Sequence, residues 1–391
     1  MTLQRIGEDH GEPASAQREI MTAENKKIVL LPGDGIGPEI TRVAVRVLRE
    51  CAAQFGLAFE FDERPFGGSA IDKSGEPLPA ETLAACRSSD AILLAAIGGP
   101  KWDAVPPEKR PESGLLALRK ALGLYINLRP IDLHVPLRGL SPLRADRAVD
   151  IHIDFVRELA GDVYFGEHRV DADPSGERAT DAGSYTTGEI ERVAKYAFER
   201  AKERKGRVAS VDKSNVLAMS RLWRKTVTRM AADYPGVKLE HMYVDNAAMQ
   251  LVLAPAQFDV ILTSNMFGDI LSDLGAALAG SIGLIPSMSL GSGPALYEPI
   301  HGSAPTLAGK DVANPVGMIL SATMMMRESF GLAKEAESIE SAVDRLFENG
   351  IRTLDTMQPG MTQVGCVEFG ERLCAEMSAG PRQPKRAEHG A

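Results

Sequence analysis

Short runs of apolar residues alternate with segments of helical patterning along much of this chain. Residues 27–31, 91–96, 207–212 and 258–263 form such runs, and a segment that favours a helix follows each of them. Apolar runs of this length are typical of strands that are buried on both faces. Because strands that alternate with helices build a sheet covered by helices, the pattern predicts an α/β fold.

The centre of the chain departs from this alternation. Residues 151–156, 163–166 and 183–186 favour shorter strands and hairpins, and long helices are expected again at 315–328 and 334–348. The chain has 391 residues, of which 44% are hydrophobic. This exceeds one typical domain, so we expect two.

Composition excludes several classes of protein. The formal net charge of −9 argues against a nucleic-acid partner, because phosphates attract basic surfaces. No stretch approaches the roughly 18 uninterrupted apolar residues of a membrane helix. The four cysteines lack Cys-x-x-Cys spacing, which favours reduced thiols and a cytoplasmic protein. Residues 1–25 show no signal peptide, and we expect them and residues 378–391 to be disordered extensions.

A glycine-rich turn at 32–37 joins the first strand to the first helix. Its glycines alternate as Gly-x-Gly-x-Gly, which differs from the dinucleotide-binding fingerprint. Such a turn either only reverses the chain tightly or holds a ligand against the backbone. The residues alone leave both readings open.

A second motif follows the strand at 258–263. Asp269 and Asp273 lie four residues apart on a predicted helix, so both carboxylates project from one face about a turn apart. Two such carboxylates are able to share one hard cation. A solvated face of an amphipathic helix gives the same pattern.

Three arginines and two proton carriers are the remaining candidates. Arg119, Arg129 and Arg157 lie near predicted loops and strand ends, where guanidinium groups match carboxylates of a dicarboxylate in bidentate pairs. Tyr164 and Lys213 carry groups suited to proton transfer. Taken singly, each of these residues also suits an ordinary surface or strand position.

Nine blocks in order carry a family resemblance. The blocks are Leu31 to Glu39, Leu118 to Lys120, Asn127 to Pro130, Val156 to Leu159, Tyr164 to Glu167, Val211 to Leu217, Val244 to Ala247, Asn265 to Asp273, and His301 to Pro305. From Lys26 to about Glu376 the chain resembles the β-decarboxylating 2-hydroxyacid dehydrogenases, and within them the members that act on 3-isopropylmalate. No single block is specific, but nine in order are.

The resemblance implies a role for each candidate. Asp245, Asp269 and Asp273 would hold Mg²⁺ or Mn²⁺, and Arg119, Arg129 and Arg157 would bind the substrate carboxylates. Lys213 would act as the base and Tyr164 as the acid, while NAD accepts hydride. The cofactor-binding residues that the resemblance implies are Ile36, His301, Gly302, Ser303, Ala304, Pro305, Thr306 and Asn314.

The resemblance also implies an architecture. Members of the family have two α/β domains with mixed sheets around a cleft, which differs from a Rossmann fold. Here residues 26–124 and 281–377 would form the first domain on the cofactor side, and residues 125–280 the second, with an arm for dimerisation. Lys213 and Asp245 would reach into the site from a second subunit, so an obligate homodimer is implied, without nucleic-acid or membrane partners.

The implied reaction is NAD-dependent oxidative decarboxylation of a 3-alkylmalate, with 3-isopropylmalate in leucine biosynthesis as the first expectation. Leu115, Leu116 and Val216 would form an apolar substrate wall, whereas Ser113 offers a hydroxyl that suits a further carboxylate. Isocitrate, homoisocitrate, tartrate, malate and other 3-substituted malates are the alternatives. Different in class are a non-catalytic regulatory subunit of this fold and a binding module for dicarboxylates or nucleotides.

The chain departs from the family at three places. The usual Arg-Glu-Leu-Thr-Gly-Gly turn reads Arg157 to Asp162 with Ala-Gly-Asp at its end, and His168 stands where proline is common. Thr306 stands where NAD-dependent members usually carry aspartate. The first two flank Tyr164 and bear on substrate fit. The third predicts weaker discrimination between NAD and NADP.

Overall fold

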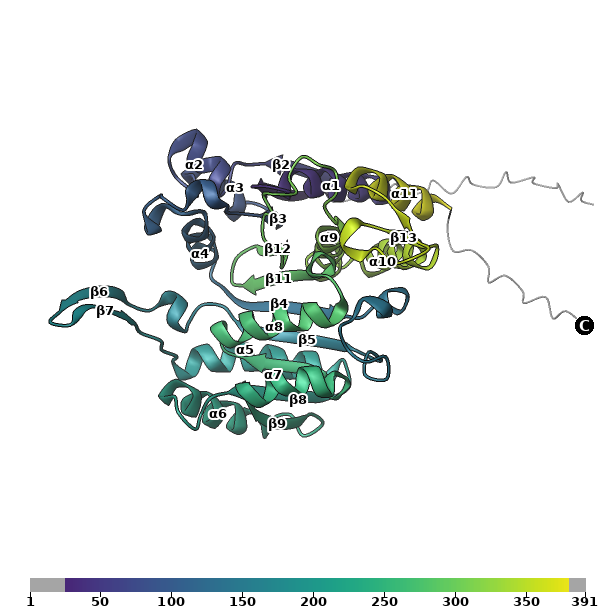
Figure 1. The fold of residues 1–391 in the computed structure, drawn as a ribbon. Coiled ribbons are helices and arrows are strands. Elements are labelled where there is room, and N and C mark those ends of the chain that lie inside the picture. Colours follow the sequence, from purple (N-terminus) through teal and green to yellow (C-terminus); the bar gives the residue numbers. More distant parts are fainter. Residues whose placement is uncertain (1–24, 380–391) are drawn as a thin grey trace, which may run out of the picture.

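A single mixed sheet runs through the part of the chain that the computed structural model describes, residues 25–379 (Figure 1). In spatial order its ten strands are β2 (Phe59–Glu63), β1 (Lys26–Gly33), β3 (Ala91–Ala96), β12 (Ala295–Pro299), β11 (Pro286–Gly291), β4 (Leu124–Asp132), β5 (His152–Glu158), β10 (Val260–Thr263), β8 (Arg207–Asp212) and β9 (Lys238–Tyr243). The predicted extensions 1–25 and 378–391 fall almost wholly outside the described residues.

The direction of the strands changes in the middle of the sheet. At one end β2, β1, β3 and β12 are parallel, and at the other end β5, β10, β8 and β9 are parallel. Between these blocks β11 pairs antiparallel with β12 and β4, and β4 pairs antiparallel with β5. The predicted α/β fold with a mixed sheet is therefore confirmed.

Helices cover both blocks of the sheet. They are α1 (Gly37–Phe55), α2 (Gly68–Ser74), α3 (Ala80–Arg87), α4 (Pro111–Ala121), α5 (Thr187–Lys202), α6 (Ala218–Ala231), α7 (Val244–Leu253), α8 (Asn265–Ala279), α9 (Val316–Glu328), α10 (Ala333–Glu348) and α11 (Cys366–Ser378). Figure 1 shows α8 lying along β4 and β5, with α7 close to it. Thus α8 spans the strands at which the sheet changes direction.

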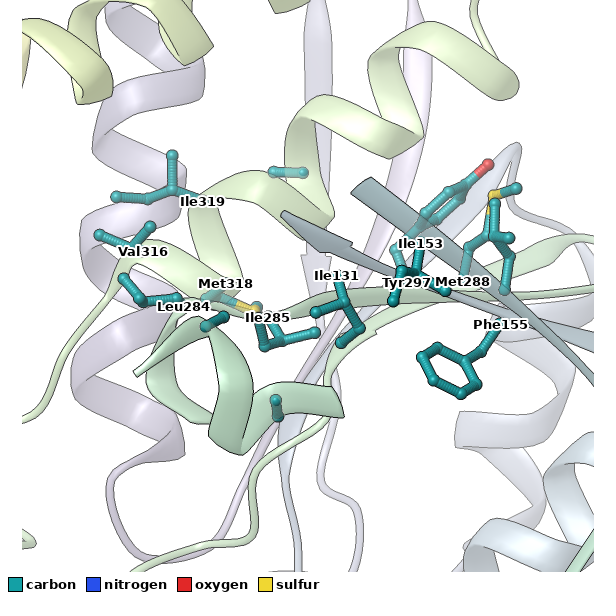
Figure 2. Packing of buried hydrophobic residues seen from close by; sticks show 14 of the residues in the cluster. Ile131, Ile153, Phe155, Leu284, Ile285, Met288, Tyr297, Val316, Met318 and Ile319 are labelled. Carbon is teal, nitrogen blue, oxygen red and sulfur yellow. The ribbon is translucent and has the colours of Figure 1, made fainter. Parts of the chain in front are cut away.

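The core lies between these helices and the central strands. Ile131, Phe155, Met288 and Tyr297 are all at most 1% exposed and pack in one cluster where the two strand blocks meet (Figure 2). Along β4, successive side chains face opposite sides of the sheet. Leu128 is therefore buried in the core, while its neighbours Asn127 and Arg129 turn polar groups to the opposite face.

Two predicted strands in the centre of the chain are wrong. Residues 163–165 form a 3₁₀ turn (η4, Val163–Phe165), and residues 183–186 form the loop that precedes α5. The hairpin consists instead of β6 (His168–Asp173) and β7 (Gly176–Asp181), which project from the body as an arm (Figure 1). Both strands are rich in charged residues and nearly fully exposed, so they lack the apolar run that marks a buried strand.

A short sheet of β13 (Ile351–Arg352) and β14 (Thr362–Gln363) completes the structure. All four cysteines are buried with free thiols, as predicted. Among residues 25–379, no helix has the length and apolar character needed to cross a membrane.

Candidate active site

A cavity of about 270 Å³ opens between the two strand blocks. Its walls come from β3, α4 and the segment after β12 on one side, and from β4, β5 and α8 on the other. Arg119, Arg129, Arg157, Tyr164 and Asp269 all line it. Five of the candidates scattered through the sequence are therefore brought together.

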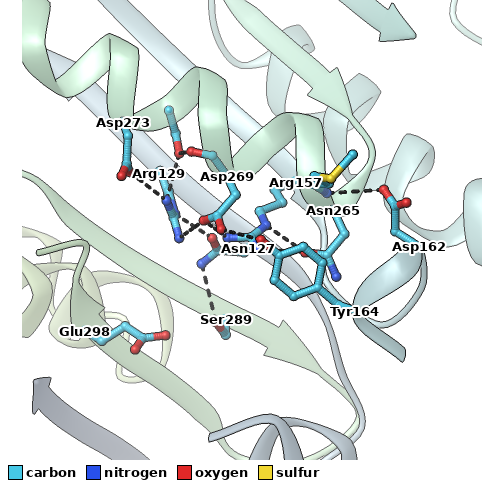
Figure 3. Close-up of polar contacts among 12 residues, drawn as sticks. Asn127, Arg129, Arg157, Asp162, Tyr164, Asn265, Asp269, Asp273, Ser289 and Glu298 are labelled. Atoms are coloured by element: carbon cyan, nitrogen blue, oxygen red, sulfur yellow. Dashed lines mark hydrogen bonds and ion pairs between the residues drawn. The ribbon is translucent and has the colours of Figure 1, made fainter. Parts of the chain in front are cut away.

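Arg157 is held by the first two turns of α8 (Figure 3). Its Nε and Nη2 donate to Asn265 Oδ1 at 2.9 and 2.6 Å, and its Nη1 donates to Asp269 Oδ1. The aliphatic part of Arg157 passes so close to the helix that a Cβ on Gly268 would lie 2.6 Å from Arg157 Cγ. Glycine at this position of the motif is thus what lets α8 approach Arg157.

Arg129 is fixed from both ends of its guanidinium group. Its Nε donates to Asn127 Oδ1 at 2.8 Å, and its Nη1 donates to Ser272 Oγ at 2.8 Å and Asp273 Oδ1 at 3.3 Å. Its Nη2 lies 3.2 Å from Asp269 Oδ1. One arginine therefore connects both carboxylates of the predicted metal motif.

Arg119 faces these two arginines across the cavity. Its Nη2 donates to Glu298 Oε1 at 2.6 Å, and both residues are 8% exposed. Its Nε is buried and has no hydrogen-bond partner among the described residues. The site therefore leaves unused donor capacity on a fixed guanidinium group.

Tyr164 contacts Asp269 in the same cavity. Its hydroxyl donates to Asp269 Oδ2 at 2.7 Å (Figure 3). Burial and the bond to Asp269 raise the pKa of Tyr164 to about 12, so the hydroxyl keeps its proton. For Asp269, burial alone would raise the pKa, but Arg157 and Arg129 outweigh it and hold the pKa below its ordinary value. The pair is thus a protonated donor on an ionised carboxylate.

The wall beside Arg119 is apolar. Leu115 and Leu116 on α4 line the cavity, as does Ile97 beyond β3. The Ser113 hydroxyl donates to the carbonyl oxygens of Glu108 and Arg110 and is absent from the cavity lining. The side chain that could have served a further carboxylate is therefore engaged elsewhere.

The glycine-rich turn packs against the 301–306 segment. Ile36 N donates to Ser303 O at 2.8 Å, and Gly35, at φ +59°, lies so close that a Cβ would meet Ser303 O at 2.0 Å. The Asp34 carboxylate accepts from the backbone nitrogens of Gly68, Ser69 and Gly98, which ties three loops together. The turn therefore does more than reverse the chain, because it holds the surrounding loops together.

The remaining predicted cofactor residues differ in placement. His301 and Gly302 line the cavity, Ser303 is buried, and Thr306 is exposed and lies outside the cavity lining. His301 Nε2 is a buried ring nitrogen without a partner among the described residues. Asn314 is buried, and its amide donates to Asp355. Ala304 and Pro305 link these positions, with Ala304 at φ +39°.

Comparison with known proteins supplies the family. The family described as isocitrate/isopropylmalate dehydrogenase matches residues 27–373. The chain belongs to the isocitrate/isopropylmalate dehydrogenase family. It is 54% identical over 359 residues to a 3-isopropylmalate dehydrogenase of Thermosynechococcus vestitus, covering 91% of this chain and 99% of that one. It is 56% identical over 355 residues to that of Nitratidesulfovibrio vulgaris, covering 88% of this chain and 98% of the relative.

Solved structures of the isocitrate/isopropylmalate dehydrogenase family share the fold. An isocitrate dehydrogenase from Methylococcus capsulatus matches with a TM-score of 0.79 and 31% identity, covering 90% of this chain and 99% of that one. A β-decarboxylating dehydrogenase from Thermococcus kodakarensis in its apo form matches with a TM-score of 0.73 and 36% identity, covering 90% and 96%.

Three predicted site residues of this family member lie apart from the cavity. Lys213 Nζ lies 2.9 Å from Asp245 Oδ2, but the cavity lining includes neither residue. The Asp245 side chain is 68% exposed, and Val216 is 62% exposed. Within residues 25–379, no three acidic, histidine or cysteine side chains gather as a metal site. Within one chain, Asp269 and Asp273 thus lie together on α8, whereas Asp245 lies away from both and outside the cavity.

Several residues of this site have roles that the sequence patterns do not predict. Glu298 pairs with Arg119, Asn265 orients Arg157, and Glu112 lines the cavity next to Leu115. Asn265 and Asp34 lie within motifs that the sequence shows, so these motifs are the signal by which both residues could be found. Glu298 directly precedes Pro299 before the His301 segment, and only its contact with Arg119 distinguishes it from other strand residues.

Proposed function

We propose that this protein catalyses the NAD-dependent oxidative decarboxylation of 3-isopropylmalate, with Mg²⁺ or Mn²⁺ as second cofactor. The observation that carries the proposal is the composition of the cavity, in which three arginines face a protonated tyrosine and an apolar leucine wall. The two 3-isopropylmalate dehydrogenases that are 54% and 56% identical to this chain support the same substrate. The alternatives, isocitrate above all, need a polar group where Leu115 and Leu116 stand.

The arginines act as the carboxylate clamp. Arg129 and Arg157 are fixed by Asn127 and Asn265, so their forks are ordered before substrate arrives. Arg119 has a free Nε and faces them. Bidentate guanidinium pairs orient both carboxylates of a malate. The alkyl group then falls against Leu115 and Leu116, where burial of apolar surface stabilises it.

Lys213 removes the proton from the C2 hydroxyl, and Tyr164 returns a proton to C3 after carbon dioxide leaves. The raised pKa of Tyr164 keeps it in the donor form. Lys213 reaches the substrate from the partner subunit, because its own chain holds it beside Asp245 and away from the cavity.

Both cofactors fit groups of this chain. Asp269 and Asp273 offer hard oxygen donors one helical turn apart, which suits Mg²⁺ or Mn²⁺. The unpartnered His301 Nε2 and the backbone junction around Ser303 fit a polar cofactor beside the cavity. When bound, NAD accepts hydride and the cation acts as a Lewis acid on the substrate oxygen.

A homodimer supplies the missing side chains. Met249, Val252 and Leu253 on α7 and Ile270 on α8 are large apolar residues between 42% and 62% exposed. An apolar surface of this kind marks an interface. The arm of β6 and β7 reaches outward from the same half of the sheet (Figure 1). We also propose the domain division at residues 26–124 with 281–377, and 125–280, which places the cavity between the two domains.

One assay tests the proposal. NAD reduction is followed with racemic 3-isopropylmalate and Mg²⁺, with and without a chelator, and again with isocitrate. A third carboxylate against Leu115 and Leu116 would lose its water without gaining a partner, so kcat/KM for isocitrate should be lower by about a hundredfold or more. The matched variant Ser113→Ala should leave both values unchanged. Comparable kcat/KM for the two acids would contradict the proposed substrate, and turnover that survives chelation would contradict the metal.

A further inference from the structure

Asp162 holds a backbone conformation that is essentially restricted to glycine. Its φ is 68° and its ψ is −165°. The residue is also 2% exposed, so its carboxylate is buried. In the family pattern this position is the last glycine of the turn before Tyr164. A side chain at this point strains the backbone and therefore needs a compensating contact.

The Asp162 carboxylate bridges two segments of the site. One oxygen, Oδ1, accepts from Val163 N at 2.9 Å, at the first residue of the 3₁₀ turn that carries Tyr164. The other, Oδ2, accepts from Met266 N at 3.2 Å, in the first turn of α8. Figure 3 shows Asp162 at the end of α8 that carries Asn265, opposite the end with Asp273.

The start of α8 depends on this contact. Ser264 stands at the N-cap position but makes no side-chain capping bond, and its buried Oγ has no partner among residues 25–379. Asn265 N donates to the Tyr185 hydroxyl at 2.9 Å. In the described part of the chain, the acceptor for Met266 N is thus Asp162, whose negative charge also suits a helix N-terminus.

We propose that Asp162 is a positioning residue that sets the Tyr164 hydroxyl against Asp269. The two segments that its carboxylate joins meet again one turn further in, where Tyr164 donates to Asp269 Oδ2 at 2.7 Å. Asp162 therefore fixes the distance between the proton donor and the helix of the metal carboxylates. This inference rests on the proposed function, because it takes Tyr164 as the group that protonates C3.

Three variants test the inference. Asp162→Gly removes both contacts but also relieves the strain, and because these two effects oppose each other its melting temperature should stay close to that of the unchanged protein. Asp162→Asn keeps a side-chain oxygen as acceptor. Asp150→Gly is the matched control, since Asp150 also has a positive φ of 55° but is exposed and pairs with Lys205.

The first readout is hydrogen exchange of the protein without ligands. The amides of Val163 and Met266 should exchange faster in Asp162→Gly than in the unchanged protein, with Asp162→Asn in between and Asp150→Gly unchanged. This measurement does not depend on the substrate, so it separates a failure of the positioning role from a failure of the proposed function.

The second readout is pre-steady-state kinetics with 3-isopropylmalate, NAD and Mg²⁺. Asp162→Gly should retain its first turnover of NADH but lose steady-state kcat by about ten- to a hundredfold, because only the step that Tyr164 serves is misaligned. KM should stay nearly constant, and Asp162→Asn should recover part of the loss. If activity instead follows the melting temperature across the variants, or if Asp162→Gly matches Asp150→Gly in both readouts, the positioning role is wrong.

Discussion

The candidate site consists of two sets of residues in different states. The cavity set (Arg119, Arg129, Arg157, Tyr164 and Asp269) is linked by ion pairs and hydrogen bonds within one chain. The second set, called the exposed set below, consists of Lys213, Val216 and Asp245 and lies outside the cavity. Val216 is 62% exposed, the Asp245 side chain is 68% exposed, and the Lys213 side chain is 26% exposed. The cavity set is thus ordered by buried contacts within its own chain, whereas the Lys213 side chain pairs with Asp245 and lies over the Tyr243 ring at the surface.

Buried ion pairs preorganise the cavity set. In the cavity set, burial of Arg157 beside Arg129 lowers the pKa of Arg157 to about 10, and Asp269 supplies the compensating charge. Such a network is costly to disturb, because an unpaired buried charge remains. Asp245 is the exposed partner of the Lys213–Asp245 pair, with 68% of its side chain exposed, and a pair at the surface contributes little to stability. The chain itself therefore fixes the exposed set less firmly than the cavity set.

The largest expected effects separate the two proton carriers. Lys213→Ala should slow hydride transfer by about 10²- to 10⁴-fold, because the base is lost. Tyr164→Phe should leave the dehydrogenation step and impair decarboxylation and protonation. Supplying the 2-oxo intermediate should therefore rescue Lys213→Ala and fail to rescue Tyr164→Phe.

Lys205→Ala serves as the control, since Lys205 pairs with Asp150 in the same kind of exposed ion pair. An unchanged rate of hydride transfer in Lys213→Ala would refute the role of Lys213.

The next effect tests whether the exposed set acts on another chain. If each site combines the cavity set of one subunit with the exposed set of its partner, Lys213→Ala and Tyr164→Phe chains complement each other. A mixed dimer then has one intact site of two, so refolding equal amounts together should recover about a quarter of the normal activity. Each variant refolded alone is the control. No recovery, with mixed dimers present by mass spectrometry, would place the exposed set in its own chain's site.

The sequence predicts which residues form the cavity set better than it predicts how the strands and helices around them are arranged. The apolar runs at 91–96 and 207–212 match β3 and β8 to the residue, because β3 is buried on both faces and β8 is buried except at Arg207 and Ala209, which are half-buried. The arm strands β6 and β7 escape prediction, since they are charged and exposed. Motif blocks find Arg157 and Asp269, but their contact depends on Gly268 and on the pairing of β5 with β10.

The sequence does not predict most contacts between side chains that are far apart along the chain. Glu298 lies 179 residues from Arg119, and Asp162 lies 104 residues from Met266. No local pattern links such partners. The departure at Asp162 is visible in the sequence as a lost glycine, but its consequence, a cap on α8, appears only when both segments are placed. The roles of the cofactor residues stay predictions.

A smaller effect on cofactor preference is expected at Thr306, which is exposed like Val216 and Asp245 of the exposed set. A carboxylate at this position should accept hydrogen bonds from the ribose of NAD and repel the phosphate of NADP. Thr306→Asp should therefore raise the ratio of kcat/KM for NAD over NADP by about tenfold, with solvent screening limiting the gain. Thr306→Asn is the matched uncharged control. Strong NADP preference in the unchanged protein would contradict this placement of Thr306.

The smallest expected effect is on the pH dependence of the melting temperature, and it concerns two histidines that differ in burial. His241 is half-buried on β9, and burial, with Arg224 nearby, lowers its pKa below the ordinary 6.5. His152 is exposed, and its hydrogen bond to Asp132 raises its pKa above 6.5.

The signs of the two contributions to stability are opposite. Since folding weakens proton binding at His241, its contribution is present above pH 6.5 and is lost as the pH falls through the folded pKa. The contribution of His152 is fully present below pH 6.5 and is lost as the pH rises through its folded pKa. His241→Gln should therefore gain melting temperature relative to the unchanged protein as the pH falls from about 7.5 to 5.5, and His152→Gln should lose it, each by about 1–2 °C. Melting curves of both variants across this range check the prediction, and parallel shifts of the same sign would show that burial does not set the direction.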